Sequence, residues 1–145
     1  MYLTEFNLTA EEEQLLDVYN RCPYSLCEVI EVKPGIGMTI VDLLRRRKYE
    51  IVERSASQTV KRGQILYCAP TQLAGINFNV AMSPYALRPI VKRDVLELRD
   101  WMTEEIGTER ITTKHLLEFE GAIRGLYLYI LKVMFRPPQI LMVIR

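Results

Sequence analysis

The first regular pattern of apolar and polar positions along the chain predicts a helix over residues 10–21. Thr9 and Glu12 have the spacing of a capping box, in which the two side chains satisfy backbone amides at the start of a helix. Pro23 ends the helix, because proline has no amide hydrogen to donate to the preceding turn. The apolar residues at helical spacing are Leu15, Leu16, Val18 and Tyr19.

Five short runs rich in apolar and β-branched residues follow, and each run predicts a β-strand. They cover residues 26–32, 38–44, 49–53, 65–69 and 76–82. Turn residues such as Pro34 and Gly35 separate runs that recur roughly every 8–12 residues, a spacing typical of small barrels. We therefore expect an α+β fold around a five-stranded SH3-like or OB-like β-barrel, and the pattern fits both barrels equally.

The hairpin between the second and third runs is expected to have a basic tip. Four like charges stand between two apolar runs there, at Arg45, Arg46, Arg47 and Lys48. Pairing of Leu44 with Tyr49 would bring Asp42 and Glu53 to one face of this hairpin. Two carboxylates can divide acid and base roles, but alternating charges on a solvated strand face are the more common interpretation.

Helical periodicity returns after Pro89 and predicts two C-terminal helices. Apolar residues mark one face of a helix over residues 91–106, which Gly107 ends. A second helix is expected over residues 113–136, and its second half is apolar on nearly every side. Such a helix is either buried all round or part of an interface.

The apolar excess at the carboxyl end predicts self-association. Residues 140–144 are also apolar, and burying such side chains is favourable by about 1.5–3 kcal/mol each, before the entropy lost on ordering. We expect a homo-oligomeric binding or assembly module whose contact residues are Leu128, Leu131, Phe135, Ile140, Leu141 and Val143.

The composition fits one small folded unit with helical extensions. Of the 145 residues, 49% are hydrophobic and 26% are charged, which are values typical of globular proteins. The expected parts are an N-terminal helical segment (1–23), the barrel (24–90) and a C-terminal helical extension with its tail (91–145). The net charge of +1 gives the chain no overall attraction to nucleic acid or to membranes.

A local basic rim makes the binding of RNA or single-stranded DNA the alternative function. The hairpin tip, Lys61 and Arg62 are expected on one rim of the barrel. Tyr49, Tyr67 and Phe78 lie in the predicted strands, and aromatic side chains beside a positive groove are typical of proteins that bind single strands. A solvated tip without a ligand is the simpler interpretation of the same charges.

The sequence contains no catalytic or metal-binding constellation. Ser55 and Ser57 lie near Glu53 but lack the glycines of a nucleophile elbow, so a hydrolytic enzyme is the least favoured function. His115 is the single histidine and lies far along the chain from the cysteines. We therefore expect no metal site and no cofactor.

The cysteine count and the N-terminus indicate the compartment. An odd number of cysteines, Cys22, Cys27 and Cys68, argues against a disulfide framework and for a reducing environment. The chain does not begin with a basic segment followed by an apolar run, and it has no stretch of about 18 uncharged apolar residues. A cytoplasmic protein without a membrane partner is expected.

Three segments of the chain resemble one group of proteins. EVIEVKPGIGMTIVDLL (residues 28–44), VERSAS (52–57) and KRGQILY (61–67) are similar to uncharacterised prokaryotic proteins that often carry a C-terminal SEC-C zinc motif. The resemblance implies a related β-rich fold. It implies no zinc site, because that motif needs a C-terminal cysteine cluster and this chain has no cysteine after Cys68. A shortened version of a longer protein is one interpretation of this departure.

Overall fold

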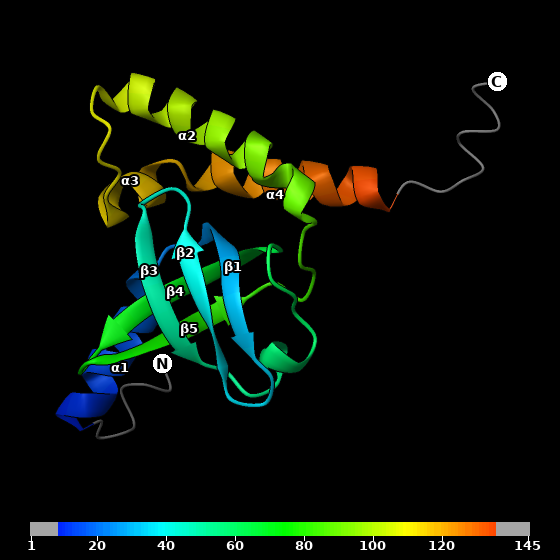
Figure 1. Cartoon of the computed structure of the whole chain (residues 1–145). Coiled ribbons are helices and arrows are strands. Elements are labelled where there is room, and N and C mark those ends of the chain that lie inside the picture. Colours follow the sequence, from blue (N-terminus) through cyan, green and yellow to red (C-terminus); the bar gives the residue numbers. More distant parts are fainter. Residues whose placement is uncertain (1–8, 136–145) are drawn as a thin grey trace.

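An antiparallel sheet with helices at its ends makes up the protein, whose computed structural model describes residues 9–135 (Figure 1). The elements in chain order are α1 (Ala10–Arg21), β1 (Ser25–Lys33), β2 (Gly37–Asp42), β3 (Arg47–Val52), η2 (Ala56–Gln58), β4 (Ile65–Leu73), β5 (Ile76–Met82), η3 (Pro89–Val91), α2 (Lys92–Ile106), α3 (Thr113–Glu118) and α4 (Glu120–Met134). The α+β class, the five strands and the helix expected over residues 10–21 are thus confirmed.

The sheet is open and strongly curled. Its strand order is β3-β2-β1-β4-β5, and every neighbouring pair is antiparallel. The edge strands β3 and β5 approach each other as the sheet curls (Figure 1), but no ladder joins them within residues 9–135. The described sheet is therefore not a closed barrel, and its relation to the SH3-like and OB-like barrels stays a prediction.

The hairpin of β2 and β3 has a different register from the expected one. Ile40, and not Leu44, lies opposite Tyr49, so the expected pairing is wrong. Asp42 lies at the turn end of the hairpin, whereas Glu53 follows the opposite end of β3. The two carboxylates are consequently not brought to one site.

The turn of this hairpin explains its register. The Asp42 Oδ1 atom accepts hydrogen bonds from the amides of Leu44 (2.9 Å) and Arg45 (3.1 Å). The amide of Arg46 donates to the Asp42 carbonyl at 2.8 Å, and Arg46 has a left-handed φ of 59°. Residues 43–46 thus form the turn that the aspartate side chain stabilises, and the ladder between the two strands ends at Asp42 and Arg47.

Both faces of the curled sheet are buried. In β1, Leu26 packs toward the helices whereas Cys27 and Val29 point into the curl, as alternation along a strand requires. The cluster inside the curl consists of Cys27, Val29, Met38, Ile40, Tyr49, Ile51, Leu66 and Cys68. The outer cluster joins the sheet to the helices and contains Leu26, Leu43, Leu44, Ile65, Tyr67, Leu87, Val91, Val95, Met102, Ile111, Leu116, Ile123, Tyr127 and Ile130.

The C-terminal part has one more helix than expected. The helix expected over residues 91–106 is confirmed as α2, and Gly107 ends it with a φ of 84°. The single helix expected over residues 113–136 is divided into α3 and α4 at Phe119. Phe119 leaves the helical conformation, and its ring packs edge-on against Trp101 of α2 with 5.5 Å between the ring centroids. The two long helices α2 and α4 then lie over one end of the sheet (Figure 1).

Candidate functional site

Helix α4 has a solvent-facing side made largely of apolar residues. Its opposite side is buried through Ile123, Tyr127 and Ile130, which recur at helical spacing and pack on the outer cluster. The large apolar side chains left in solvent at this helix and its last turn are Leu128 (54% exposed), Tyr129 (65%), Val133 (49%) and Phe135 (60%). About half or more of each of these side chains is in solvent within residues 9–135.

Two glycines continue this face toward the start of α4. Gly121 and Gly125 are exposed, and a methyl group added at either position would meet no atom within 4 Å. At 100° per residue they fall on the same side as Lys132 and Tyr129. Glycine inside a helix costs roughly 0.5–1 kcal/mol of stability relative to alanine. The two glycines therefore do not favour the helix, and they leave this part of its exposed face without side chains.

The residues expected in self-association therefore have different environments. Leu128 and Phe135 are exposed, and the ring of Phe135 contacts that of the exposed Tyr85 edge-on at 5.3 Å. Leu131 is half-buried against the outer cluster. Three of the residues lie outside the described part of the chain: Ile140, Leu141 and Val143.

Arg45, expected at the exposed basic tip, points inward instead. Its Nε atom lies 2.6 Å from the Asp42 carboxylate, and the two side chains are 5% and 0% exposed. Its Nη1 atom donates to Thr113 Oγ1 at 2.8 Å and so ties the hairpin to α3. Burial lowers the pKa of the Arg45 guanidinium, but the charge and the hydrogen bond of Asp42, with smaller contributions from Tyr49 and Cys27, together raise that pKa above its ordinary value. Arg45 therefore stays protonated and connects the β2–β3 hairpin to α3.

The other expected cations do not share one rim. Arg46, Arg47 and Lys48 are exposed at the β2–β3 turn. Lys61 and Arg62 are exposed on the loop before β4. Strand β3, which carries Lys48, is separated by β2 and β1 from β4, so the two groups lie at strands that are three positions apart in the sheet.

The aromatic residues expected to stack on bases are mostly covered. Tyr67 is buried between the rings of Tyr24 and Tyr127, whose centroids lie 4.5 and 4.6 Å away. Tyr49 is only 4% exposed and belongs to the cluster inside the curl. Phe78 is half-buried in β5. None of the three presents a free ring beside the exposed cations.

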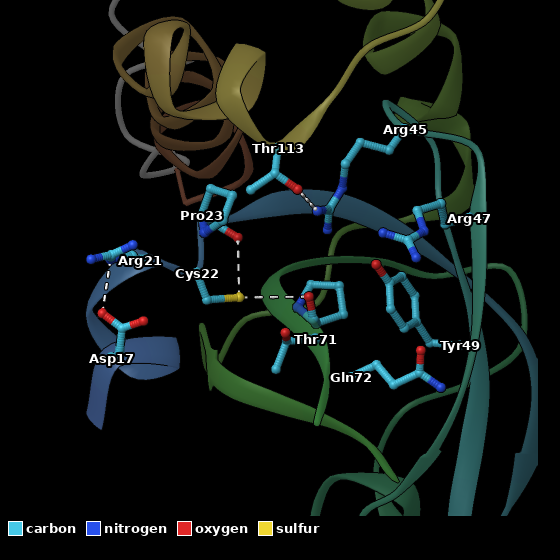
Figure 2. A pocket seen from close by; sticks show the side chains of 11 residues that line it. Asp17, Arg21, Cys22, Pro23, Arg45, Arg47, Tyr49, Thr71, Gln72 and Thr113 are labelled. Atoms are coloured by element: carbon cyan, nitrogen blue, oxygen red, sulfur yellow. Dashed lines mark hydrogen bonds and ion pairs between the residues drawn. The ribbon is translucent and has the colours of Figure 1, made fainter. Parts of the chain in front are cut away.

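A pocket of about 330 Å³ lies where the end of α1, the start of β3 and the end of β4 meet (Figure 2). The guanidinium groups of Arg45 and Arg47, the hydroxyl of Tyr49 and the side chain of Thr71 line it, and Cys22 forms part of its floor. Sequence reasoning missed this site, because its residues come from segments distant in the chain. The local signal in the sequence was the spacing of Asp42 and Arg45, since an aspartate three residues before an arginine in a turn can form an ion pair with it.

The remaining candidate groups have structural roles. The Ser57 hydroxyl accepts from the Gly35 amide at 3.0 Å and donates to the Arg54 carbonyl at 3.0 Å. His115 caps α3, since its Nδ1 atom accepts from the Thr112 amide at 3.0 Å. No three His, Cys, Asp or Glu side chains within the described residues are grouped so that they could hold a metal ion.

The three cysteines are free thiols, and burial makes Cys22 and Cys27 poor nucleophiles. Cys27 is fully buried, and burial raises its pKa well above the ordinary value. Cys22 is half-buried with its Sγ atom 3.6 Å from the carbonyls of Ala69 and Pro70. Burial raises the pKa of Cys22 despite the opposing charge of Arg45, so this thiol is protonated at neutral pH.

Comparison with known proteins identifies a family but no characterised relative. None of the helices in the described part of the chain has the length and apolar character needed to span a bilayer. No curated protein and no solved structure matches the chain. The model of one protein family matches residues 2–119, which include every residue lining the pocket and end where α3 gives way to α4. The chain therefore belongs to this family of unknown function, DUF7986.

Proposed function

We propose that the protein is an assembly module that self-associates through the exposed face of α4. The supporting observation is that four large apolar side chains, from Leu128 to Phe135, are about half or more exposed on and just after one helix. Monomeric soluble proteins rarely leave contiguous apolar patches of this kind in water, and such patches mark interaction surfaces. A second copy of the same chain offers the same face in return.

The length of α4 allows a helix-to-helix contact. A helix of 15 residues such as α4 is about 22 Å long. Tyr85, in contact with Phe135, extends the apolar surface beyond the helix end. In a two-fold contact each side chain of the face is buried once on each copy, so it contributes twice to the buried area. A specific interface buries about 1,200–2,000 Å² in total.

An antiparallel pair of α4 helices centred near Tyr127 gives complementary shapes. Gly121 of each copy would then lie opposite Val133 of the other copy, and Gly125 would lie opposite Tyr129. The missing side chains at the glycines leave room for the large ones, so the two backbones can approach closely.

Sedimentation velocity at micromolar protein concentration tests this function. The wild-type protein should sediment as a dimer, and Val133→Asp should shift it to the monomer because a carboxylate would be buried in the contact. Ile36→Asp is the matched control, since Ile36 is 66% exposed at the β1–β2 turn, away from α4. A wild-type protein that sediments as a monomer at these concentrations would exclude the assembly role.

Binding of RNA or single-stranded DNA is a second proposed function. The partly open curl of the sheet is typical of OB-like barrels, which often bind oligonucleotides, and an OB-like or SH3-like relationship is part of this proposal. Exposed cations support it at the turn end of β3, where Arg46, Arg47 and Lys48 stand together. A SEC-C relationship likewise stays a prediction.

Fluorescence anisotropy with labelled oligouridylate at low salt tests nucleic-acid binding. Phosphate contacts should dominate, so the logarithm of the affinity should fall linearly with the logarithm of the salt concentration. Replacing Arg46 and Lys48 with methionine should flatten that slope. The absence of any anisotropy change at low salt would exclude this function.

A further inference from the structure

The pocket beside Arg45 contains a charged donor without an acceptor. The Arg45 side chain is 5% exposed, its Nε atom is paired with Asp42, and its Nη1 atom is bonded to Thr113. Its Nη2 atom is buried and has no hydrogen-bond partner among residues 9–135. Buried polar groups are almost always satisfied in folded proteins, so this donor requires a partner that the chain does not supply.

The unpaired donor lies at the edge of a space large enough for a ligand. Figure 2 shows the Arg45 guanidinium pointing from the hairpin into the space between Pro23 and Arg47. That space is the pocket of about 330 Å³, at the small end of the range for ligand sites. A second hollow of about 380 Å³ shares Arg45, Arg47 and Thr113 with it and adds Arg110.

The charge around this space is positive. Arg47 lines the pocket, is exposed and has no ion pair with any described residue. Asp17 is the one acidic residue among the described lining residues, and its charge is offset by Arg21 at 2.8 Å. The Arg45 charge is balanced by Asp42, so the charge of Arg47 is left over, and Arg110 adds another beside it.

Neutral donors complete the lining. The Tyr49 hydroxyl points toward the two guanidinium groups, and no lining residue is hydrogen-bonded to it (Figure 2). Burial raises the pKa of Tyr49 despite the opposing charges of Arg45 and Arg47, so the hydroxyl keeps its proton and can donate it. Thr71 and Gln72 add a hydroxyl and an amide at the opposite wall. The lining is therefore rich in donors and suited to an anion with several acceptor oxygens.

We propose that this pocket binds the phosphate group of a small molecule, with Arg45 and Arg47 as the charged donors and Tyr49 as a neutral one. A phosphate monoester carries close to two negative charges and three acceptor oxygens. Arginine is the side chain best suited to such a group, because its fork of N–H donors matches two phosphate oxygens at once. This site is independent of self-association, since none of its lining residues belongs to α4.

Isothermal titration calorimetry in a dilute chloride buffer tests the site with three probes: inorganic phosphate, glycerol 3-phosphate and succinate. At least one phosphate probe should bind, and succinate should bind more weakly. Binding of both phosphate probes assigns the phosphate group itself as the ligand, whereas binding of glycerol 3-phosphate alone assigns a phosphorylated metabolite. If neither phosphate probe binds, or if succinate binds as tightly, the assignment is overturned and water is left as the partner of the Arg45 Nη2 atom.

Matched substitutions separate a specific site from general charge screening. Arg47→Met should weaken phosphate binding by at least about tenfold, because it removes charged hydrogen bonds to the ligand. Lys48→Met is the control, since it removes the same charge from the next residue of β3, which points to the other face and does not line the pocket. Equal losses in the two variants would contradict the proposed site.

A second substitution tests the neutral donor without changing the charge. Tyr49→Phe should weaken phosphate binding by less than Arg47→Met and leave thermal unfolding nearly unchanged, because no described side chain depends on that hydroxyl. Arg45→Met is a poor test, since it would leave the buried Asp42 carboxylate without its partner. Unchanged phosphate affinity in both Arg47→Met and Tyr49→Phe would overturn the site.

Discussion

Asp42 and Arg45 form a buried ion pair within a single hairpin turn. The Arg45 Nε atom lies 2.6 Å from Asp42 Oδ2, and the carboxylate also accepts from the Ser25 hydroxyl and from two turn amides. Both carboxylate oxygens of Asp42 thus accept hydrogen bonds. Because Arg45 also bonds to Thr113, this pair determines both the shape of the turn and the position of α3 beside it.

Asp42→Ala should strongly destabilise the protein. The substitution leaves the guanidinium of Arg45 buried without its counter-charge, and breaking a buried ion pair in this way costs about 3–5 kcal/mol. Urea unfolding followed by circular dichroism measures the change in the free energy of unfolding. The double variant Asp42→Asn with Arg45→Met should be less destabilised than Asp42→Ala, because neither residue then leaves a buried charge.

An exposed ion pair in the same protein provides the control for that experiment. Arg21 and Asp17 lie 2.8 Å apart, but their side chains are 77% and 55% exposed. Arg21→Met should change the free energy of unfolding by less than about 1 kcal/mol, because water already screens this pair. Equal effects of Asp42→Ala and Arg21→Met would contradict the structural role assigned to the buried pair.

Arg99→Leu should destabilise the contact between the hairpin and α2. The Arg99 guanidinium is buried and donates to the carbonyls of Leu44 (3.1 Å) and Glu109 (2.5 Å). A hydrogen bond from a charged donor contributes about 1.5–3 kcal/mol, so losing both bonds should be clearly visible in urea unfolding. Arg93→Leu is the control because Arg93 is exposed and paired only with Glu97 on its own helix.

The sequence predicted the elements of this fold better than it predicted how they pair. Local patterns were sufficient for α1, α2 and the five strands, since capping residues, alternation and glycine stops act over a few residues. The register of β2 and β3 was predicted wrongly, because the aspartate that sets the turn was treated as a strand residue. The break at Phe119 was also missed, and the ring of this residue contacts Trp101 in another helix, a contact that the local pattern does not reveal.

The two candidate sites differ in the same way. The apolar excess of α4 follows from periodicity alone. Leu128 and Phe135 are exposed, so within the described residues the helix is not buried all round, and its place in an interface stays a prediction. The phosphate pocket could not be predicted, because Cys22, Arg45 and Thr71 meet only after the sheet curls. The basic run of the hairpin looked uniform in the sequence, yet its first arginine is buried and its others are exposed.

Stability should decline in alkaline solution as buried tyrosines ionise. Burial raises the pKa of Tyr67, and it raises that of Tyr127 as well although Ser83 and the Tyr85 carbonyl act in the opposite direction. Each neutral hydroxyl therefore adds stability that is fully present below the unfolded-state value of about 10 and is lost as the pH rises through the folded-state value. The free energy of unfolding should fall above about pH 10 by up to about 1.4 kcal/mol per pH unit for each such group.

Tyr67→Phe should make this alkaline decline shallower. The phenylalanine ring keeps the stack between Tyr24 and Tyr127 but has no proton to lose. Tyr129→Phe is the control, because Tyr129 is exposed on α4 and its ring is outside the stack. Urea unfolding at several values between neutral pH and pH 11 gives the slopes, and identical slopes for wild type and Tyr67→Phe would show that Tyr67 is not responsible.

Gly125→Ala should affect folding and self-association in opposite directions. A methyl group at this exposed helical position meets no atom of the same chain, so the monomer should gain roughly 0.5–1 kcal/mol from better helix propensity. In the proposed antiparallel contact the same methyl group would meet Tyr129 of the second copy and hold the helices apart. The dimer dissociation constant measured by sedimentation equilibrium should therefore rise. Adding Gly125→Ala to the monomeric variant Val133→Asp should raise the unfolding temperature of that variant.

Gly107→Ala is unsuitable as a control because Gly107 has a φ of 84°, which alanine adopts only with strain. Leu96→Ala serves instead, since Leu96 is 40% exposed on α2 and should leave the dissociation constant unchanged. A more stable monomer with an unaltered dissociation constant would show that the glycine face of α4 is not where two copies meet.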